Sequence, residues 1–195
     1  MHMINLALQA CLHLKLTEHE KYDHYKESKG SSIILTFCLL SWQDLYETHF
    51  KSSAMGTFLS KIPDTMTTGL DLMHYKPVAG FIDLPGDKRE CGIMQDIKIS
   101  CTSAAARESI LARVSKVAQA VESEKKDNEV LTFLVVSSLD SDTEMRLFLR
   151  FSSRDAMERH IRRKDLLDMW MASKEDITQM ASRGYVPNGK GWLHR

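Results

Sequence analysis

The sequence lacks an excess of charge of either sign, because 26 lysines and arginines balance 26 aspartates and glutamates. A protein that holds nucleic acid through its phosphates needs a local surplus of cations. Only one short basic cluster exists, at residues 159–164, and it is interleaved with acids at Glu158, Asp165 and Asp168. This pattern predicts a solvated helix face and no nucleic-acid partner.

Long apolar runs and a basic leader are also missing. No stretch is long and apolar enough to span a bilayer, and polar residues interrupt the fairly apolar start at residues 3–16, so we expect neither a membrane partner nor a signal peptide. The four cysteines have no CxxC spacing and no paired histidines, which predicts reduced thiols and no metal site. These absences predict a soluble, cytoplasmic protein.

Two common catalytic motifs are absent as well. The sequence contains no nucleophile-elbow pattern around a serine and no glycine-rich loop that could hold phosphate. Serine hydrolases and nucleotide-binding enzymes of these types can therefore be set aside.

The sequence does contain a repeat. Residues 41–50 (SWQDLYETHF) align without a gap with residues 152–161 (SSRDAMERHI), and Ser, Asp, Glu and His recur in register. Each copy follows a run of strand-forming residues and precedes a Tyr-x-Pro phrase, at Tyr75 and at Tyr185. We interpret this as two copies of a small domain, at residues 1–83 and 91–195, joined by a linker at residues 84–90.

The second copy predicts a complete set of elements. Strands are expected at residues 91–101, 130–137 and 144–151, and helices at residues 104–121 and 154–171, capped by Ser103 and Ser153. More helix at residues 175–182 and a short strand at 183–192 would close it. This order is typical of an α+β, ferredoxin-like split βαβ module with helices on one sheet face. Two such modules, packed through apolar opposite faces, would form a pseudo-dimeric α/β barrel within one chain.

The first copy is shorter at its front. A strand at residues 32–40, a helix at 43–62 and a strand at 69–75 repeat the end of the module. Before them, residues 4–16 alternate as in a strand, and residues 21–31 are too polar to supply a further helix and strand. The first copy is therefore predicted to be incomplete.

These phrases resemble the antibiotic biosynthesis monooxygenase superfamily, whose members are dimeric α/β barrels. The resemblance rests on residues 130–133 (VLTF), 147–151 (LFLRF) and 156–160 (AMERH) in that order, and on residues 47–55 and 58–59 of the first half. It departs from the superfamily after His160, where Arg162, Arg163 and Lys164 replace small residues. The resemblance implies a small-molecule oxygenase that needs no cofactor (no metal, flavin or haem) and that acts on an aromatic substrate with dioxygen.

His160 and His49 are the candidate catalytic residues. Each lies on the apolar stripe of its expected helix, His160 together with Ala156, Leu167 and Trp170, so each should face the sheet. An imidazole is a suitable acid or base at neutral pH. The alternative is a core histidine bonded to a structural partner.

Five further residues are candidates for substrate binding, each with a structural alternative. Trp42 and Trp170 could stack on an aromatic ring, or be core residues. Arg150, beside Phe148 on one strand face, could hold a phenolate, or belong to an exposed ion-paired ladder. Tyr185 could donate to an oxyanion, or mark an architectural strand end.

Two functions follow. The first is a cofactor-independent monooxygenase for an aromatic or polyketide-like small molecule. The second is a non-catalytic small-molecule-binding or accessory protein with the same fold, and the incomplete first copy favours it. In both cases the chain forms an intramolecular pseudo-dimer, and a homodimer is possible.

Overall fold

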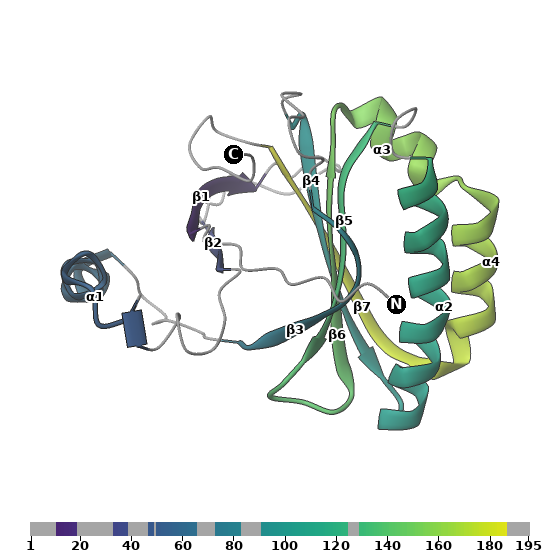
Figure 1. Ribbon diagram of the computed structural model, residues 1–195, viewed down its shortest axis with the longest axis horizontal. Helices are drawn as coiled ribbons and strands as arrows, with labels where there is room; N and C mark the ends of the chain where they lie inside the picture. The colour runs from purple at the N-terminus through teal and green to yellow at the C-terminus, as the bar shows by residue number, and fades with distance from the viewer. Residues whose placement is uncertain are drawn as a thin grey trace, which may run out of the picture.

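The computed structural model describes residues 11–18, 33–38, 47–48, 50–65, 73–82, 91–124 and 129–186. One sheet of seven strands organises them, in the order β2-β1-β7-β4-β6-β5-β3 (Figure 1). The strands are β1 (Cys11–Glu18), β2 (Ile33–Cys38), β3 (Tyr75–Phe81), β4 (Ile93–Cys101), β5 (Val130–Ser138), β6 (Glu144–Phe151) and β7 (Ile177–Val186). The helices are α1 (Ser53–Thr65), α2 (Ala104–Ser123), α3 (Arg154–Ile161) and α4 (Lys164–Ser173), and a short 3₁₀ helix (Lys174–Asp176) follows α4.

The C-terminal half is a ferredoxin-like module. Its four strands lie in the order β7-β4-β6-β5 and every neighbouring pair is antiparallel. Helices α2, α3 and α4 all cover one face of these strands (Figure 1). The predicted α+β class and split βαβ arrangement are confirmed, and β6 has the predicted bounds.

Local sequence explains the main helix. Ser103 caps α2 by accepting a hydrogen bond from the Ala106 N–H at 3.1 Å, as predicted. One side of α2 is buried against the sheet, and its residues are Ala106, Ile110, Leu111, Val114, Val117, Ala118 and Val121. Burying an aliphatic side chain of this size contributes about 1.5–3 kcal/mol to the free energy of unfolding. Burial of this stripe therefore stabilises the packing of α2 against the sheet.

The two faces of the sheet differ in chemistry. Alternate residues of β6, namely Met145, Leu147, Leu149 and Phe151, belong to the core under the helices. The residues between them, Arg146, Phe148 and Arg150, therefore point to the opposite face. That face was expected to be apolar, but it buries charged side chains: Asp96 and Arg146 form an ion pair there at 3.4 Å.

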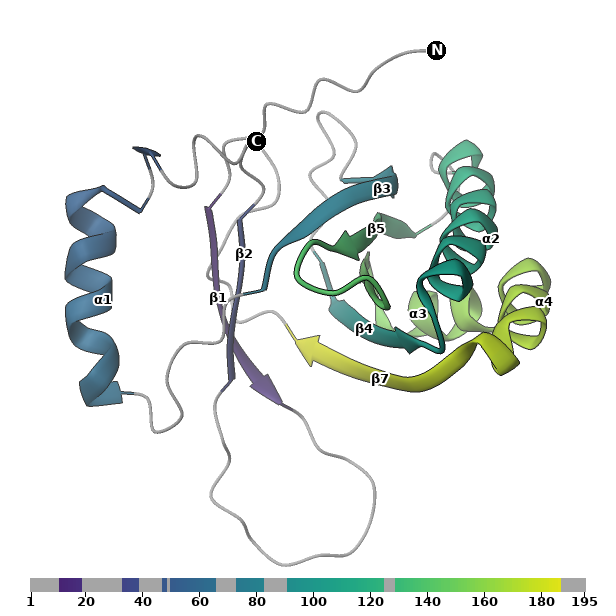
Figure 2. The same ribbon diagram turned by 90° about the horizontal axis from the view of Figure 1, so that it is seen from below.

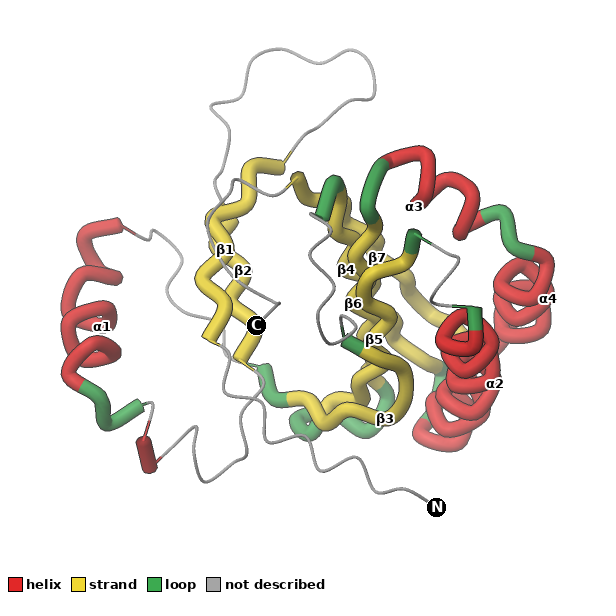
Figure 3. The backbone as a smooth tube through the Cα atoms, turned by 45° about the horizontal axis from the view of Figure 1, so that its top comes forward, coloured by secondary structure: helices red, strands yellow, loops and turns green. Residues whose placement is uncertain are grey.

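The N-terminal half extends the same sheet at both sides. β3 pairs with the free edge of β5, and β1 pairs with the free edge of β7 and carries β2. The sheet curls, so that the β1–β2 hairpin stands opposite β4, β5 and β6, and α1 lies on the outer side of that hairpin (Figures 2 and 3). This arrangement confirms the predicted pseudo-dimeric barrel architecture. Within the described residues, β2 and β3 are the two edge strands.

Two predictions for the end of the module are wrong. Residues 154–171 do not form one helix, because Arg163 has an extended backbone (φ −59°, ψ 134°) and separates α3 from α4. Residues 177–182, expected as helix, belong instead to strand β7, which pairs with β4 along nearly its whole length. Its side chains are mostly exposed, so they lack the burial alternation by which a strand is recognised.

One strand of the N-terminal half is also displaced from its predicted place. It was expected to end at Tyr75, whereas β3 begins there and continues to Phe81. Backbone pairing decides this position: Tyr75 lies opposite Ser138, and Phe81 opposite Phe133. The predicted linker at residues 84–90 lies outside the described residues.

The charged residues of the basic cluster are ion-paired, as expected for a solvated face, but the cluster crosses the break between α3 and α4 and includes the buried His160. Arg159 pairs with Glu129, Arg162 with Glu158, Arg163 with Glu124, and Lys164 with Asp168. In the described part of the chain, no helix is long and apolar enough to cross a membrane.

Gly80 is required where β3 bends. Its φ is +97°, and a Cβ atom there would lie 1.8 Å from the Phe133 carbonyl oxygen. We expect Gly80→Ala to lower the free energy of unfolding by at least about 2 kcal/mol, since strain and overlap add. Gly184→Ala is the matched strand control, because its Cβ would meet nothing closer than the Ile93 Cδ1 at 4.0 Å. Urea unfolding of both variants checks this, and equal stabilities would contradict it.

Candidate functional site

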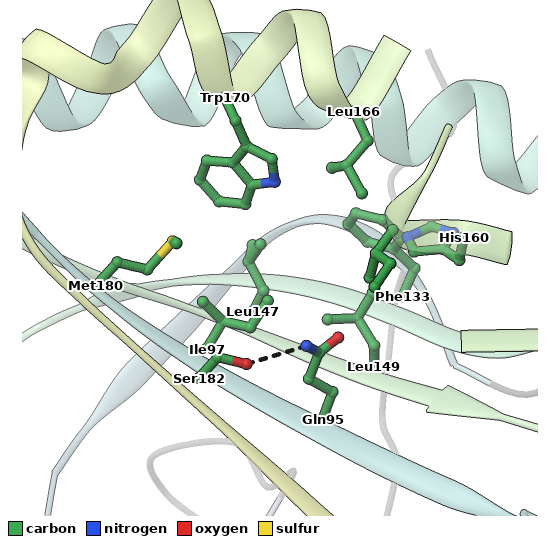
Figure 4. A pocket seen from close by; sticks show the side chains of 11 residues that line it. Gln95, Ile97, Phe133, Leu147, Leu149, His160, Leu166, Trp170, Met180 and Ser182 are labelled. Atoms are coloured by element: carbon green, nitrogen blue, oxygen red, sulfur yellow. Dashed lines mark hydrogen bonds between the residues drawn. The ribbon is translucent and has the colours of Figure 1, made fainter. Parts of the chain in front are cut away.

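A pocket lies between the helix-covered face of the sheet and helices α3 and α4. Its volume is about 230 Å³, somewhat below the ~300 Å³ at which typical ligand pockets begin. The residues that line it are Gln95, Ile97, Phe133, Leu147, Leu149, His160, Ile161, Leu166, Trp170, Met180 and Ser182 (Figure 4). Most are apolar, and none of these described residues carries a permanent charge.

The pocket exists because α3 and α4 are separate helices. In one continuous helix, Leu167 would share the stripe of His160, as the sequence predicted. The break at Arg163 shifts the phase of the second helix, so Leu166 is 5% exposed and Leu167 is 48% exposed. Leu166 and Trp170 then point from α4 toward the sheet (Figure 4).

Arg163 holds this corner between the helices. Its guanidinium donates to the Glu124 Oε2 at 2.6 Å and to the Asp165 Oδ2 at 2.8 Å, and its N–H donates to the His160 carbonyl at 3.1 Å. The hydrogen bonds from Arg163 lower the pKa of both carboxyl groups. The clamp therefore joins the end of α2 to the start of α4, directly beside His160.

His160 is a buried histidine without a structural partner. It is 4% exposed, and neither ring nitrogen has a hydrogen-bond partner among the described residues. Its ring packs against Phe133 and Phe151, with centroids 5.6 Å and 5.3 Å apart. Burial lowers the pKa of His160 to about 4, and the nearby Arg163 charge acts in the same direction. At neutral pH the ring is uncharged, and one nitrogen can accept a proton.

A polar pair interrupts the apolar wall at the opposite, more open part of the pocket. The Gln95 Nε2 donates to the Ser182 Oγ at 3.0 Å (Figure 4). Ser182 is exposed, and its neighbour on β7, Met180, is 52% exposed. The pocket thus has a buried basic end at His160 and a hydrogen-bonding mouth at Gln95 and Ser182.

Sequence reasoning missed this polar pair, although a signal for it exists. Gln95 interrupts a row of apolar residues on the helix-facing side of β4, where Ile97 and Ile99 follow it. Gly184 lies opposite Gln95 on β7 and adds no side chain there. Only the pairing of β7 with β4 brings Ser182 to the same place.

The structure brings together two of the predicted site residues and separates three. His160 and Trp170 both line the pocket. Phe148, Arg150 and Tyr185 are buried on the other face of the sheet, so they do not line this pocket, and their predicted role in substrate binding stays a prediction.

The remaining two candidates, His49 and Trp42, lie outside the described residues. Their predicted roles also stay predictions.

On the opposite face of the sheet, charged side chains interact alongside the apolar contacts. The Arg146 Cζ lies 5.2 Å from the centre of the Tyr75 ring, and its Nε lies 3.4 Å from the Asp96 Oδ1. Burial raises the pKa of Asp96, and Arg146 opposes that shift most strongly. Arg150 is buried rather than part of an exposed ladder.

No group of three or more His, Cys, Asp or Glu side chains suited to a metal ion occurs in the described ranges. Cys91 and Cys101, the cysteines described with their side chains, are free thiols.

Comparison with known proteins finds relatives in structure only. No family model and no curated protein matches the sequence. A crystal structure described as a "putative monooxygenase" from Fusobacterium nucleatum subsp. nucleatum aligns with 94% of this chain and 81% of its own, with a TM-score of 0.67 and 15% identity. Another "putative monooxygenase", from Lactobacillus acidophilus, aligns with 94% of this chain and 82% of its own, with a TM-score of 0.62 and 11% identity. At such identities the likeness concerns the fold, and the chain shares the fold of these two proteins.

Proposed function

We propose that the protein is a cofactor-independent monooxygenase that acts on a small aromatic molecule in the His160 pocket. One observation carries the proposal: a buried, uncharged histidine with no hydrogen-bond partner in the described chain borders an apolar pocket. A buried polar group normally has a structural partner, so an unpartnered one at a cavity is a candidate for chemistry. The fold shared with two proteins described as monooxygenases agrees with this reaction class.

The proposed reaction needs a proton acceptor, a dry pocket and a means to hold the resulting anion. His160 would accept the proton from an acidic hydroxyl or carbon acid, and the substrate anion would then pass an electron to dioxygen. The substrate radical and superoxide so formed would combine at a carbon that bears hydrogen, and the peroxide anion would take the proton back from His160. Loss of water from this hydroperoxide, with the remaining C–H hydrogen, would leave a carbonyl, so that one oxygen atom enters the product and the other leaves as water. Apolar walls such as Leu147 and Leu149 exclude water, which strengthens every electrostatic interaction inside. Trp170 would cover the aromatic ring of the substrate.

The low basicity of His160 restricts the substrate. A base whose pKa is about 4 removes a proton poorly from an ordinary phenol in water. In the pocket, however, the new anion would stabilise the imidazolium beside it and raise that pKa. The mechanism therefore favours substrates whose anions are already delocalised, such as anthrones and quinols.

A non-catalytic binding protein is the alternative. The observation that favours it is that His160 is the only titratable side chain among the described residues of the pocket. Such a pocket could hold an aromatic ligand without turning it over.

We also propose that residues 1–83 belong to another copy of the module at residues 91–195. The support is topological: hairpin β1–β2, helix α1 and strand β3 repeat the order of β5–β6, α3 with α4, and β7. Each half also pairs its last strand with a strand of the other half: β3 pairs with β5, and β7 pairs with β1. Residues 84–90 would be the linker.

Replacing His160 tests the proposed activity. We expect His160→Phe to lower kcat/KM for an anthrone or quinol by about 100-fold or more, since general-base catalysis contributes that much. Phenylalanine should preserve packing with Phe133 and Phe151. Oxygen uptake by the purified protein measures the effect. Met171→Leu is the control that should retain activity, because Met171 is 67% exposed on α4 and does not line the pocket. Ligand binding without oxygen uptake, in wild type and variant alike, would support the non-catalytic alternative.

The pH dependence of stability tests whether His160 is uncharged when folded. Its pKa falls from an ordinary 6.5 to about 4 on folding, so between these values the unfolded state binds more protons than the folded state. Stability from this group is complete above pH 6.5 and is lost as the pH falls toward 4, by about 3 kcal/mol. Urea unfolding of wild type and of His160→Gln at pH 7, 6 and 5 checks this. Parallel curves for the two proteins would refute it.

The isolated second copy tests the duplication. A chain of residues 91–195 loses β3 and β1, which leaves the edges of β5 and β7 unpaired. We expect these edges to pair between two molecules, giving a dimer that dissociates on dilution. Sedimentation equilibrium measures this, and a folded monomer at every concentration would contradict it.

A further inference from the structure

We propose that the pocket selects planar one- or two-ring compounds whose acidic group is conjugated across the ring to a carbonyl, with the acidic group at His160 and the carbonyl at Gln95 and Ser182. The inference rests on the proposed function, because it assumes that the His160 pocket is the ligand site. It goes beyond that function by naming the ligand class, its orientation and two residues that determine specificity.

The orientation follows from where the pocket is open. His160 is 4% exposed and lies among the Phe133 and Phe151 rings, whereas Met180 at the β7 side is 52% exposed. A ligand therefore enters past β7 and places its leading end against the imidazole. Its trailing end remains beside Gln95 and Ser182, which lie on the sheet below Trp170 (Figure 4).

The trailing end must accept hydrogen bonds. The Gln95 amide uses one of its two N–H groups on the Ser182 Oγ at 3.0 Å, which leaves a second amide N–H and the Ser182 hydroxyl proton as donors. Two donors side by side suit one oxygen acceptor. A carbonyl fits this arrangement, whereas a methyl or methylene group at that end would leave both donors without a partner from the ligand.

Conjugation links the two ends chemically. When the acidic group at the buried end loses its proton, the negative charge of the anion is shared with the carbonyl oxygen at the mouth. Gln95 and Ser182 then donate to that charge, and hydrogen bonds to charged groups are stronger than those to neutral ones. Such a substrate is also more acidic, which suits a weakly basic histidine.

The size of the pocket limits the ring system. A volume of about 230 Å³ lies at the small end for ligand sites, so one or two rings fill it. A third ring would have to project through the mouth at Met180 and Ser182.

A matched pair of ligands tests this inference. 6-Hydroxy-1-tetralone carries a phenol conjugated to a carbonyl at the far end, and 5,6,7,8-tetrahydro-2-naphthol has the same skeleton without the carbonyl. Binding is measured by calorimetry without oxygen, so that no turnover is needed. The wild-type protein should bind the tetralone about 3- to 10-fold more tightly, as expected for hydrogen bonds at a partly exposed site.

Gln95→Leu and Ser182→Ala identify the residues responsible. Each should remove most of the preference by weakening the tetralone and leaving the naphthol unchanged. The control Met171→Leu, at an exposed position of α4 that does not line the pocket, should keep the preference. Equal wild-type affinities, failure of both ligands to bind, or equal weakening of both ligands by Gln95→Leu would overturn the inference.

The outcomes separate this inference from the proposed function. Preference for the tetralone without oxygen uptake on any anthrone or quinol would support the inference and reject the monooxygenase. Turnover that depends on His160, with a ligand preference that neither Gln95→Leu nor Ser182→Ala alters, would do the reverse.

Discussion

The C-terminal sheet depends on one constraint, namely that its central strands β5 and β6 bury side chains on both of their faces. The pleat sends successive residues of β6 alternately toward the helices and toward the interior of the curled sheet. On the helix side, Leu147 and Leu149 belong to the core that also includes residues of α2, α3 and α4. On the other side Arg150 is buried and Arg146 is partly buried. A shift of β6 by one residue would place the arginines under the helices. The constraint therefore fixes the register of the sheet and assigns each face its chemistry.

The pocket is a consequence of imperfect cover on the helix side. Helix α2 packs along the sheet with an unbroken stripe of aliphatic residues, and none of its residues lines the His160 pocket. Helices α3 and α4 meet at a corner that is fastened by ion pairs of Arg163 with Glu124 and Asp165. The corner interrupts the apolar stripe of the helices. Larger side chains, including Trp170, therefore cover the space between the corner and the sheet. His160 ends α3 at the inner side of this corner, so the clamp that shapes the pocket also positions its basic group.

The environment of His160 sets the chemistry that the pocket can support. Desolvation keeps the imidazole neutral, which leaves a nitrogen able to accept a proton, but it also makes that nitrogen a weak base. The polar pair of Gln95 and Ser182 at the mouth can compensate for this weak basicity. In a conjugated ligand part of the negative charge lies at the end remote from the histidine, where the pair can stabilise it by hydrogen bonds. A weak base and a remote pair of donors are complementary only for ligands whose two ends are electronically connected.

Sequence alone determined most of the secondary structure of the second copy. The alternation in β4 and β6, the apolar run of β5, and the serine caps of α2 and α3 are local signals, and the structure follows them. The inward orientation of His160 and Trp170 was predictable from helical spacing as well. The resemblance of several short phrases to monooxygenase barrels indicated the fold.

Tertiary structure alone decided the break in the helix after His160, the strand β7 and the meeting of Gln95 with Ser182. Arg163, which follows α3, donates to the nearby Asp165 and also to Glu124 at the end of α2, 39 residues away. A local pattern does not reveal that distant partner. β7 has mostly exposed side chains and is a strand because β4 offers it an unpaired edge. The sequence thus determined which faces of the helices and strands are apolar, because the spacing of neighbouring residues encodes them. The pocket, in contrast, depends on contacts between segments that are distant in the sequence, and only the folded chain brings those segments together.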